Sequence, residues 1–65
     1  MNLVEAIQQE CNRVRESRRH YLDLGPVGMF GAAMLAQAIE SGEAAISSMD
    51  PVRMMMALTE LRDCK

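Results

Sequence analysis

Few residues of this chain have side chains suited to catalysis. Its 65 residues include one histidine, His20, and two cysteines, Cys11 and Cys64. None of its serines or cysteines lies in a recognised nucleophile motif, and no GxSxG, HExxH or phosphate-binding loop pattern occurs. His20 falls near the end of an expected helix, where the helix dipole stabilises a cation. We therefore predict a protein that is not an enzyme.

Metal and cofactor sites are not expected either. Cys11 and Cys64 lie far apart in the sequence and lack the CxxC spacing of zinc and redox sites. The carboxylates are scattered over different faces of the expected helices. Two separate thiols are typical of a reducing compartment, where cysteines stay free.

A cluster of arginines is the first feature that could bind a partner. Four of the seven Lys and Arg residues are Arg13, Arg15, Arg18 and Arg19. On a helix, the last three of these fall within an arc of about 100°, so they could face phosphate or an acidic partner. Three interpretations stay open: a solvated face, an acidic protein surface and nucleic acid. The shortage of aromatic residues for stacking makes nucleic acid the least favoured.

Methionine is the second unusual feature, with seven in the chain and three in a row at Met54, Met55 and Met56. Consecutive helical residues point about 100° apart, so the three cannot all enter one core. Because methionine is flexible and polarisable, the run predicts a partner-binding surface. The alternative is that these methionines fill gaps in a small core.

These side chains must be positioned by helices, because no run of alternating β-branched residues indicates a strand. A capping box of Asn2 and Glu5 predicts that a first helix spans about residues 3–24. Its stripe recurs at spacings of three and four: Val4, Ile7, Cys11, Val14, Arg18 and Tyr21. Gly25-Pro26 then forms a corner.

Two further helices are expected after that corner. The second spans about residues 26–48, and the third, which starts with the cap pair Asp50-Pro51, spans about 51–63. A seam of mostly small residues recurs along the second helix and into the residue after it, and it predicts a helix-packing or dimer face. Its members are Gly31, Leu35, Ala38, Gly42, Ala45 and Met49.

The predicted architecture is an all-α fold in one small helical domain, residues 1–65. Short corners make the first two helices a hairpin, and the short third helix packs against it. For so small a scaffold, hydrophobic burial barely offsets the loss of chain entropy. We therefore expect homodimerisation to complete a helical bundle.

Composition and charge narrow the class of protein further. Hydrophobic residues make up 49% and charged residues 25%, which is typical of a folded chain, and the net charge is −2. No overall positive field attracts nucleic acid or an anionic membrane. The longest nearly uncharged stretch, residues 25–39, is shorter than the roughly 20 residues that cross a bilayer. With no export signal in the first ten residues, the sequence predicts a cytoplasmic protein that does not bind membranes.

The segment GPVGMFGAAM, residues 25–34, resembles short helical accessory proteins of temperate phages and prophages of Gram-negative bacteria, and a looser similarity covers most of the chain. That resemblance implies a protein that modulates or inhibits a host protein, such as a transcription activator or a defence complex. It brings no catalytic residues with it.

Our leading interpretation is a non-enzymatic, homodimeric interaction module that binds a host protein through exposed methionines and arginines. The alternative is a small DNA-binding transcriptional regulator that uses the basic cluster from Arg13 to Arg19.

Overall fold

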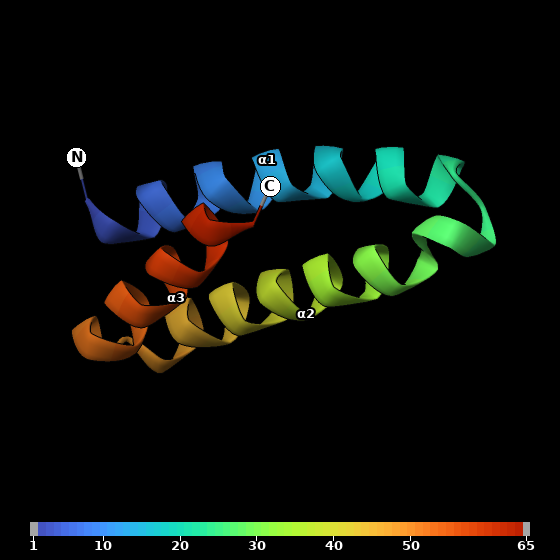
Figure 1. Cartoon of the computed structure of the whole chain (residues 1–65). Coiled ribbons are helices and arrows are strands. Elements are labelled where there is room, and N and C mark those ends of the chain that lie inside the picture. The colour runs from blue at the N-terminus through green and yellow to red at the C-terminus, as the bar shows by residue number, and fades with distance from the viewer. Residues whose placement is uncertain (1, 65) are drawn as a thin grey trace.

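The chain folds into three helices that pack together (Figure 1), and the computed structural model describes residues 2–64. Helix α1 spans Leu3–Asp23, α2 spans Pro26–Ser48 and α3 spans Pro51–Asp63. The all-α prediction is confirmed, since no strand occurs among the described residues. The first helix ends at Asp23, one residue before the expected end, because Leu24 and Gly25 already form the turn.

Local capping interactions define the helix starts. The Asn2 Oδ1 atom accepts a hydrogen bond of 2.7 Å from the backbone N–H of Glu5, and Asp50 Oδ1 accepts one of 3.0 Å from Val52. Each side chain satisfies a backbone donor that the first turn of a helix leaves free. At the corner between α1 and α2, Gly25 has a φ of 71°, a value that disfavours residues with a Cβ atom.

Helices α1 and α2 approach each other closely beside this corner. A Cβ atom on Gly28 would clash with the backbone carbonyl of Tyr21, so only glycine fits at this position. A second close approach lies at Gly42, where a Cβ atom would come within 3.1 Å of both Cys11 Sγ and Leu61 Cδ1. Gly42 thus lets α2 approach both of its neighbours.

The hydrophobic core lies where α3 packs against both α1 and α2. Its most deeply buried large side chains are Ile7, Val14 and Leu61. Four members of the small-residue seam are buried within the chain's own fold: Leu35, Ala38, Gly42 and Ala45. Gly31 is half-buried beside the ring of Tyr21.

Met49 does not join this packed seam. It follows the last residue of α2 with a left-handed backbone, φ 55°, and its side chain is 80% exposed. The helical spacing that placed it on the seam no longer applies once the helix has ended.

The molecule is an elongated body of 36 × 18 × 17 Å. At 1.5 Å per residue, the 13 residues of α3 cover about 20 Å, whereas the 21 residues of α1 reach about 32 Å. Helix α3 therefore runs beside only part of the hairpin, and the part next to the α1–α2 corner has no third helix (Figure 1). Within residues 2–64, each helix is too short or too polar to span a membrane.

Candidate binding surfaces

The methionine run is divided between core and surface. Met54 is 8% exposed and belongs to the core cluster, whereas Met55 is 57% and Met56 68% exposed. The 100° step between neighbours explains the split, because one of the three faces the hairpin and the next two face outward. The expectation that Met54 contributes to a partner-binding surface is therefore corrected, since its side chain is buried in the chain's own core.

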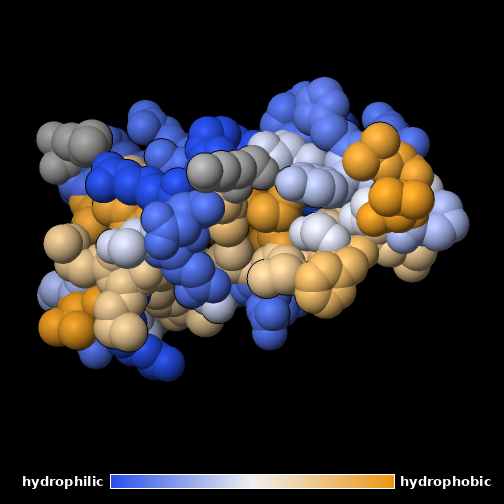
Figure 2. Space-filling view, viewed as in Figure 1, coloured by the Kyte–Doolittle hydropathy of each residue, from blue (hydrophilic) through white to orange (hydrophobic). Residues whose placement is uncertain are grey.

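The two exposed methionines belong to a larger apolar surface at the corner between α2 and α3. We call it the methionine patch, and it consists of Met49, Val52, Met55 and Met56. Figure 2 shows hydrophobic atoms gathered at this end of the molecule. Met49 and Val52 extend the surface beyond the methionine run, and the end of α2 is the signal in the sequence that could have placed Met49 here.

A second apolar surface covers the opposite end of the molecule, around the corner between α1 and α2 (Figure 2). We call it the hairpin-tip patch, and it consists of Leu22, Leu24, Val27, Met29, Phe30 and Met34. Phe30 follows the corner by four residues, and it is 77% exposed. Leu24, Val27 and Phe30 lie beyond the end of α3, whereas Leu22 and Met29 line a groove formed by α1 and α2 alone.

Three of the four clustered arginines form hydrogen bonds or ion pairs within the chain. Arg13 donates from Nη2 to the backbone oxygens of Leu61 at 2.8 Å and Cys64 at 3.0 Å. Its Nε atom lies 2.7 Å from a carboxylate oxygen of Glu10. Arg13 thus ties α1 to the carboxyl end of α3, where a cation is favoured by the helix dipole.

The next arginine connects α1 to α2. Arg15 donates to Asn12 Oδ1 at 3.0 Å and to Glu43 Oε1 at 3.2 Å. Arg19 lies 3.7 Å from Glu16 on its own helix. The cluster therefore presents a mixture of both charge signs rather than a uniform basic face.

Arg18 differs from these three. Its Nε atom is buried and has no hydrogen-bond partner among the described residues. Its side chain lines a shallow groove between α1 and α2, with a volume of about 240 Å³. The other lining residues are all apolar: Leu22, Met29, Ala32, Ala33 and Ala36. We call this surface, together with Arg18, the alanine groove.

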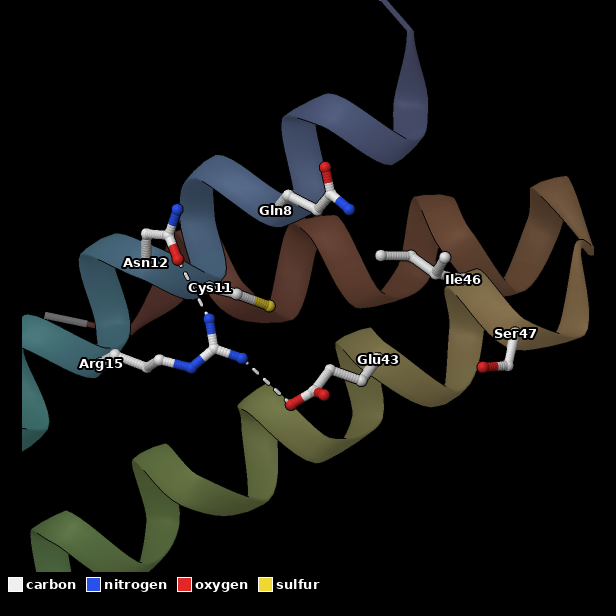
Figure 3. A pocket seen from close by; sticks show the side chains of 7 residues that line it. All are labelled: Gln8, Cys11, Asn12, Arg15, Glu43, Ile46 and Ser47. Carbon is white, nitrogen blue, oxygen red and sulfur yellow. Dashed lines mark hydrogen bonds and ion pairs between the residues drawn. The ribbon is translucent and has the colours of Figure 1, made fainter.

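A larger and more polar groove of about 480 Å³ lies further along the same two helices (Figure 3). It is lined by Gln8, Cys11, Asn12, Arg15, Glu43, Ile46 and Ser47. The bridge from Arg15 to Glu43 crosses it, and α3 lies behind it in this view.

The thiol of Cys11 is not set up as a nucleophile in this groove. Burial raises its pKa above the 9.0 of a free thiol, and this effect outweighs the nearby Arg15 guanidinium, which lowers the pKa. The thiol is therefore protonated at neutral pH, whereas an attacking sulfur must be a thiolate. His20 is exposed on the last turn of α1 and is not among the groove's lining residues. No group of three or more His, Cys, Asp or Glu side chains within residues 2–64 is arranged to hold a metal ion.

No protein family, curated protein or solved structure matches this chain. Such comparisons therefore assign no role to any of its residues.

Proposed function

We propose that this chain is a non-enzymatic interaction module that binds another protein through exposed apolar side chains. The observation that carries the proposal is the exposure of ten large hydrophobic side chains, which form the methionine patch and the hairpin-tip patch at the two ends of the molecule. Contiguous apolar surface on so small a chain is typical of protein-binding sites.

The methionine patch is the surface best suited to the partner. Met55 and Met56 lie on the outer side of α3, and both can change rotamer without disturbing the core. Thr59 lies one turn further along the same helix, and its hydroxyl donates to the backbone oxygen of Met55. The apolar surface therefore meets a polar border, an arrangement typical of protein interfaces.

The partner in this proposal is a host protein in the cytoplasm, such as a transcription activator or a defence complex, as the resemblance to phage accessory proteins implies. Self-association as a homodimer is part of the same proposal. It is supported by the small core and by the part of the hairpin that α3 does not cover.

Affinity capture from a bacterial lysate tests this function. We expect Met55→Gln or Met56→Gln to leave the melting temperature within about 2 °C but to reduce the amount of captured partner at least tenfold, because a few residues carry most of an interface's energy. Arg62→Gln, an exposed change near the opposite end of the same helix, is the matched control and should capture normally.

Full capture by both methionine variants would contradict the proposal. Loss of capture at 0.5 M salt in the unchanged chain would instead indicate binding through charges, as expected if the arginines contact nucleic acid or an acidic protein.

A further inference from the structure

The alanine groove lies on a face of the hairpin that α3 does not cover. Only residues of α1 and α2 line it, and the same holds for the polar groove further along these helices. Figure 3 shows α3 behind the polar groove, on the far side of the two helices. The α1–α2 pair therefore has a third helix on one side and an open groove on the other.

We infer that a second copy of this chain covers this face, with the two α2 helices antiparallel across Ala36 and with Arg18 of each copy against Glu40 of the other. The inference rests on the self-association in the proposed function and names its surface. Two hairpins stacked in this way form a four-helix bundle, and α3 of each copy stays on the outside.

The small side chains of the groove permit this contact. Ala32, Ala33 and Ala36 leave room for another helix to come close, and helix pairs with small contact residues pack at the short end of the 8–10 Å range. Leu22 and Met29 rise on either side of them, and both are more than half exposed. A second helix pair would remove these two apolar side chains from water.

Arg18 indicates the charge of what covers the groove. Its buried Nε lacks an acceptor, whereas Arg13, Arg15 and Arg19 all have a carboxylate within 4 Å. A buried donor without a partner is destabilising, and a carboxylate satisfies a guanidinium best. The occupant should therefore bring an acidic side chain to this position.

Glu40 of a second copy meets that requirement. It is exposed, and none of the ion pairs among residues 2–64 involves it. It follows Ala36 by four residues, and Ala32 precedes Ala36 by the same number. In an antiparallel pair of α2 helices centred on Ala36, Glu40 therefore stands opposite Ala32, which lines the same groove as Arg18.

The size of the face also suits a specific dimer. A face of 36 × 18 Å covers about 650 Å², so complete overlap of two such faces would bury about 1,300 Å² in total. This lies at the lower end of the range for stable interfaces. The contact is the same on both copies, so it closes into a dimer without leaving a free site.

Sedimentation equilibrium with single and paired charge reversals tests the inference. We expect Arg18→Glu and Glu40→Arg each to raise the dimer dissociation constant at least tenfold, because each creates a like-charge pair across the interface. The double variant Arg18→Glu/Glu40→Arg should restore it to within about threefold of the unchanged chain. Arg53→Glu and Glu60→Arg, which change exposed charges on α3, are the matched controls and should leave it unaltered.

Circular dichroism of each variant separates loss of the dimer from loss of the fold. If Arg18→Glu does not fold, the exposed Glu40→Arg carries the test, together with Arg18→Met, which keeps the length of the side chain but removes its charge. A monomeric unchanged chain, or a dimer that withstands Glu40→Arg, would overturn the inference. So would folded single variants whose dimer the double variant does not restore.

The outcome is independent of the proposed partner binding. A dimer weakened by Met55→Gln but not by Glu40→Arg would place self-association on the methionine patch and overturn the inference, while the proposed function stands. Conversely, normal dimers combined with unchanged capture by the methionine variants would refute the partner surface and leave the α2 contact intact.

Discussion

The arginines of α1 show how much the role of a side chain depends on its position around one helix. Arg13 reaches the carboxyl end of α3, Arg15 reaches Glu43 on α2, and Arg19 stays with Glu16 on its own helix. Arg18 enters the alanine groove. Four arginines within seven residues of one helix thus have four different environments. A count of charges in the sequence would have treated them as one basic patch.

The two thiols differ in their access to solvent. Cys11 is buried in the core, whereas Cys64 is half-buried at the end of α3, where its thiol donates to the Glu60 carbonyl at 3.5 Å. Burial raises the pKa of both thiols above 9.0, and it is the largest influence on each.

We predict that iodoacetamide at pH 8 modifies Cys64 slowly and leaves Cys11 unmodified in the folded chain. Both thiols should react in urea, because unfolding exposes Cys11 and returns each pKa to its ordinary value. Intact-mass spectrometry over time measures the order of modification. Faster reaction at Cys11 would show that the core opens readily around it.

The raised pKa of Cys11 also predicts how stability depends on pH. The folded chain holds this proton more tightly than the unfolded chain, so the resulting stabilisation is complete below about pH 9 and is lost as the pH rises through the folded-state pKa. We expect the melting temperature to fall from pH 8.5 to 10.5, and to fall less steeply in Cys11→Ala. Equal slopes for the two chains would contradict this linkage.

At the scale of the helices, the elements whose ends depend on local chemistry were predictable. The Asn2 and Asp50 caps act on backbone groups within three residues, and Gly25-Pro26 breaks the chain whatever packs around it. The sequence therefore predicts three helices and nearly all of their ends.

Features that depend on how the helices pack were not predictable in the same way. Met54 is an exception, because it shares the spacing of three and four with Ala57, Leu58 and Leu61, the other buried residues of α3. That period could have placed it in the core. The requirement for glycine at Gly28, by contrast, arises from the backbone of Tyr21, seven residues away on another helix. Leu24, Val27 and Phe30 at the hairpin tip are exposed because α3 is short relative to α1.

We predict that Gly28→Ala destabilises the chain more than Gly31→Ala. The added Cβ at residue 28 meets rigid backbone at Tyr21, whereas at residue 31 it meets only the half-buried Tyr21 ring, 2.9 Å away, which can turn aside. Overpacking against backbone typically costs about 1–3 kcal/mol or more. Urea denaturation gives both values, and a smaller loss for Gly28→Ala would show that the hairpin can separate without cost.

Arg13 provides a second test of how the helices are joined. We expect Arg13→Met to lower the free energy of unfolding by about 1 kcal/mol, because it leaves the carbonyls of Leu61 and Cys64 without their charged donor. Arg19→Met, which breaks only an exposed ion pair, should cost less than about 0.5 kcal/mol. Equal losses would mean that the carboxyl end of α3 does not need this contact.

At the scale of the whole molecule, the protein is a hairpin of which only part is covered by a third helix. The core cluster brings together residues of all three helices, while the other end of the hairpin exposes Leu24, Val27 and Phe30. A chain of this size gains little net stability from its core alone. Association with a second copy would therefore contribute directly to folding.

Thermal melting at several protein concentrations examines that coupling. We predict that the melting temperature rises by several degrees between 2 and 200 µM, since dissociation accompanies unfolding and mass action favours the dimer at high concentration. Glu40→Arg should melt at a lower temperature that depends less on concentration. A single melting temperature at all concentrations of the unchanged chain would show that the monomer folds unaided.

The two apolar patches lie at opposite ends of a body 36 Å long. If each end of one chain holds a partner, that chain has a valence of two and a dimer of it has a valence of four. Either one acts as a molecular bridge that keeps bound molecules near each other but apart. The abundance of such ternary assemblies passes through a maximum as the bridge is added, because excess bridge occupies each partner separately. The concentration of this elongated protein relative to its partners would then determine whether it brings them together or occupies each of them separately.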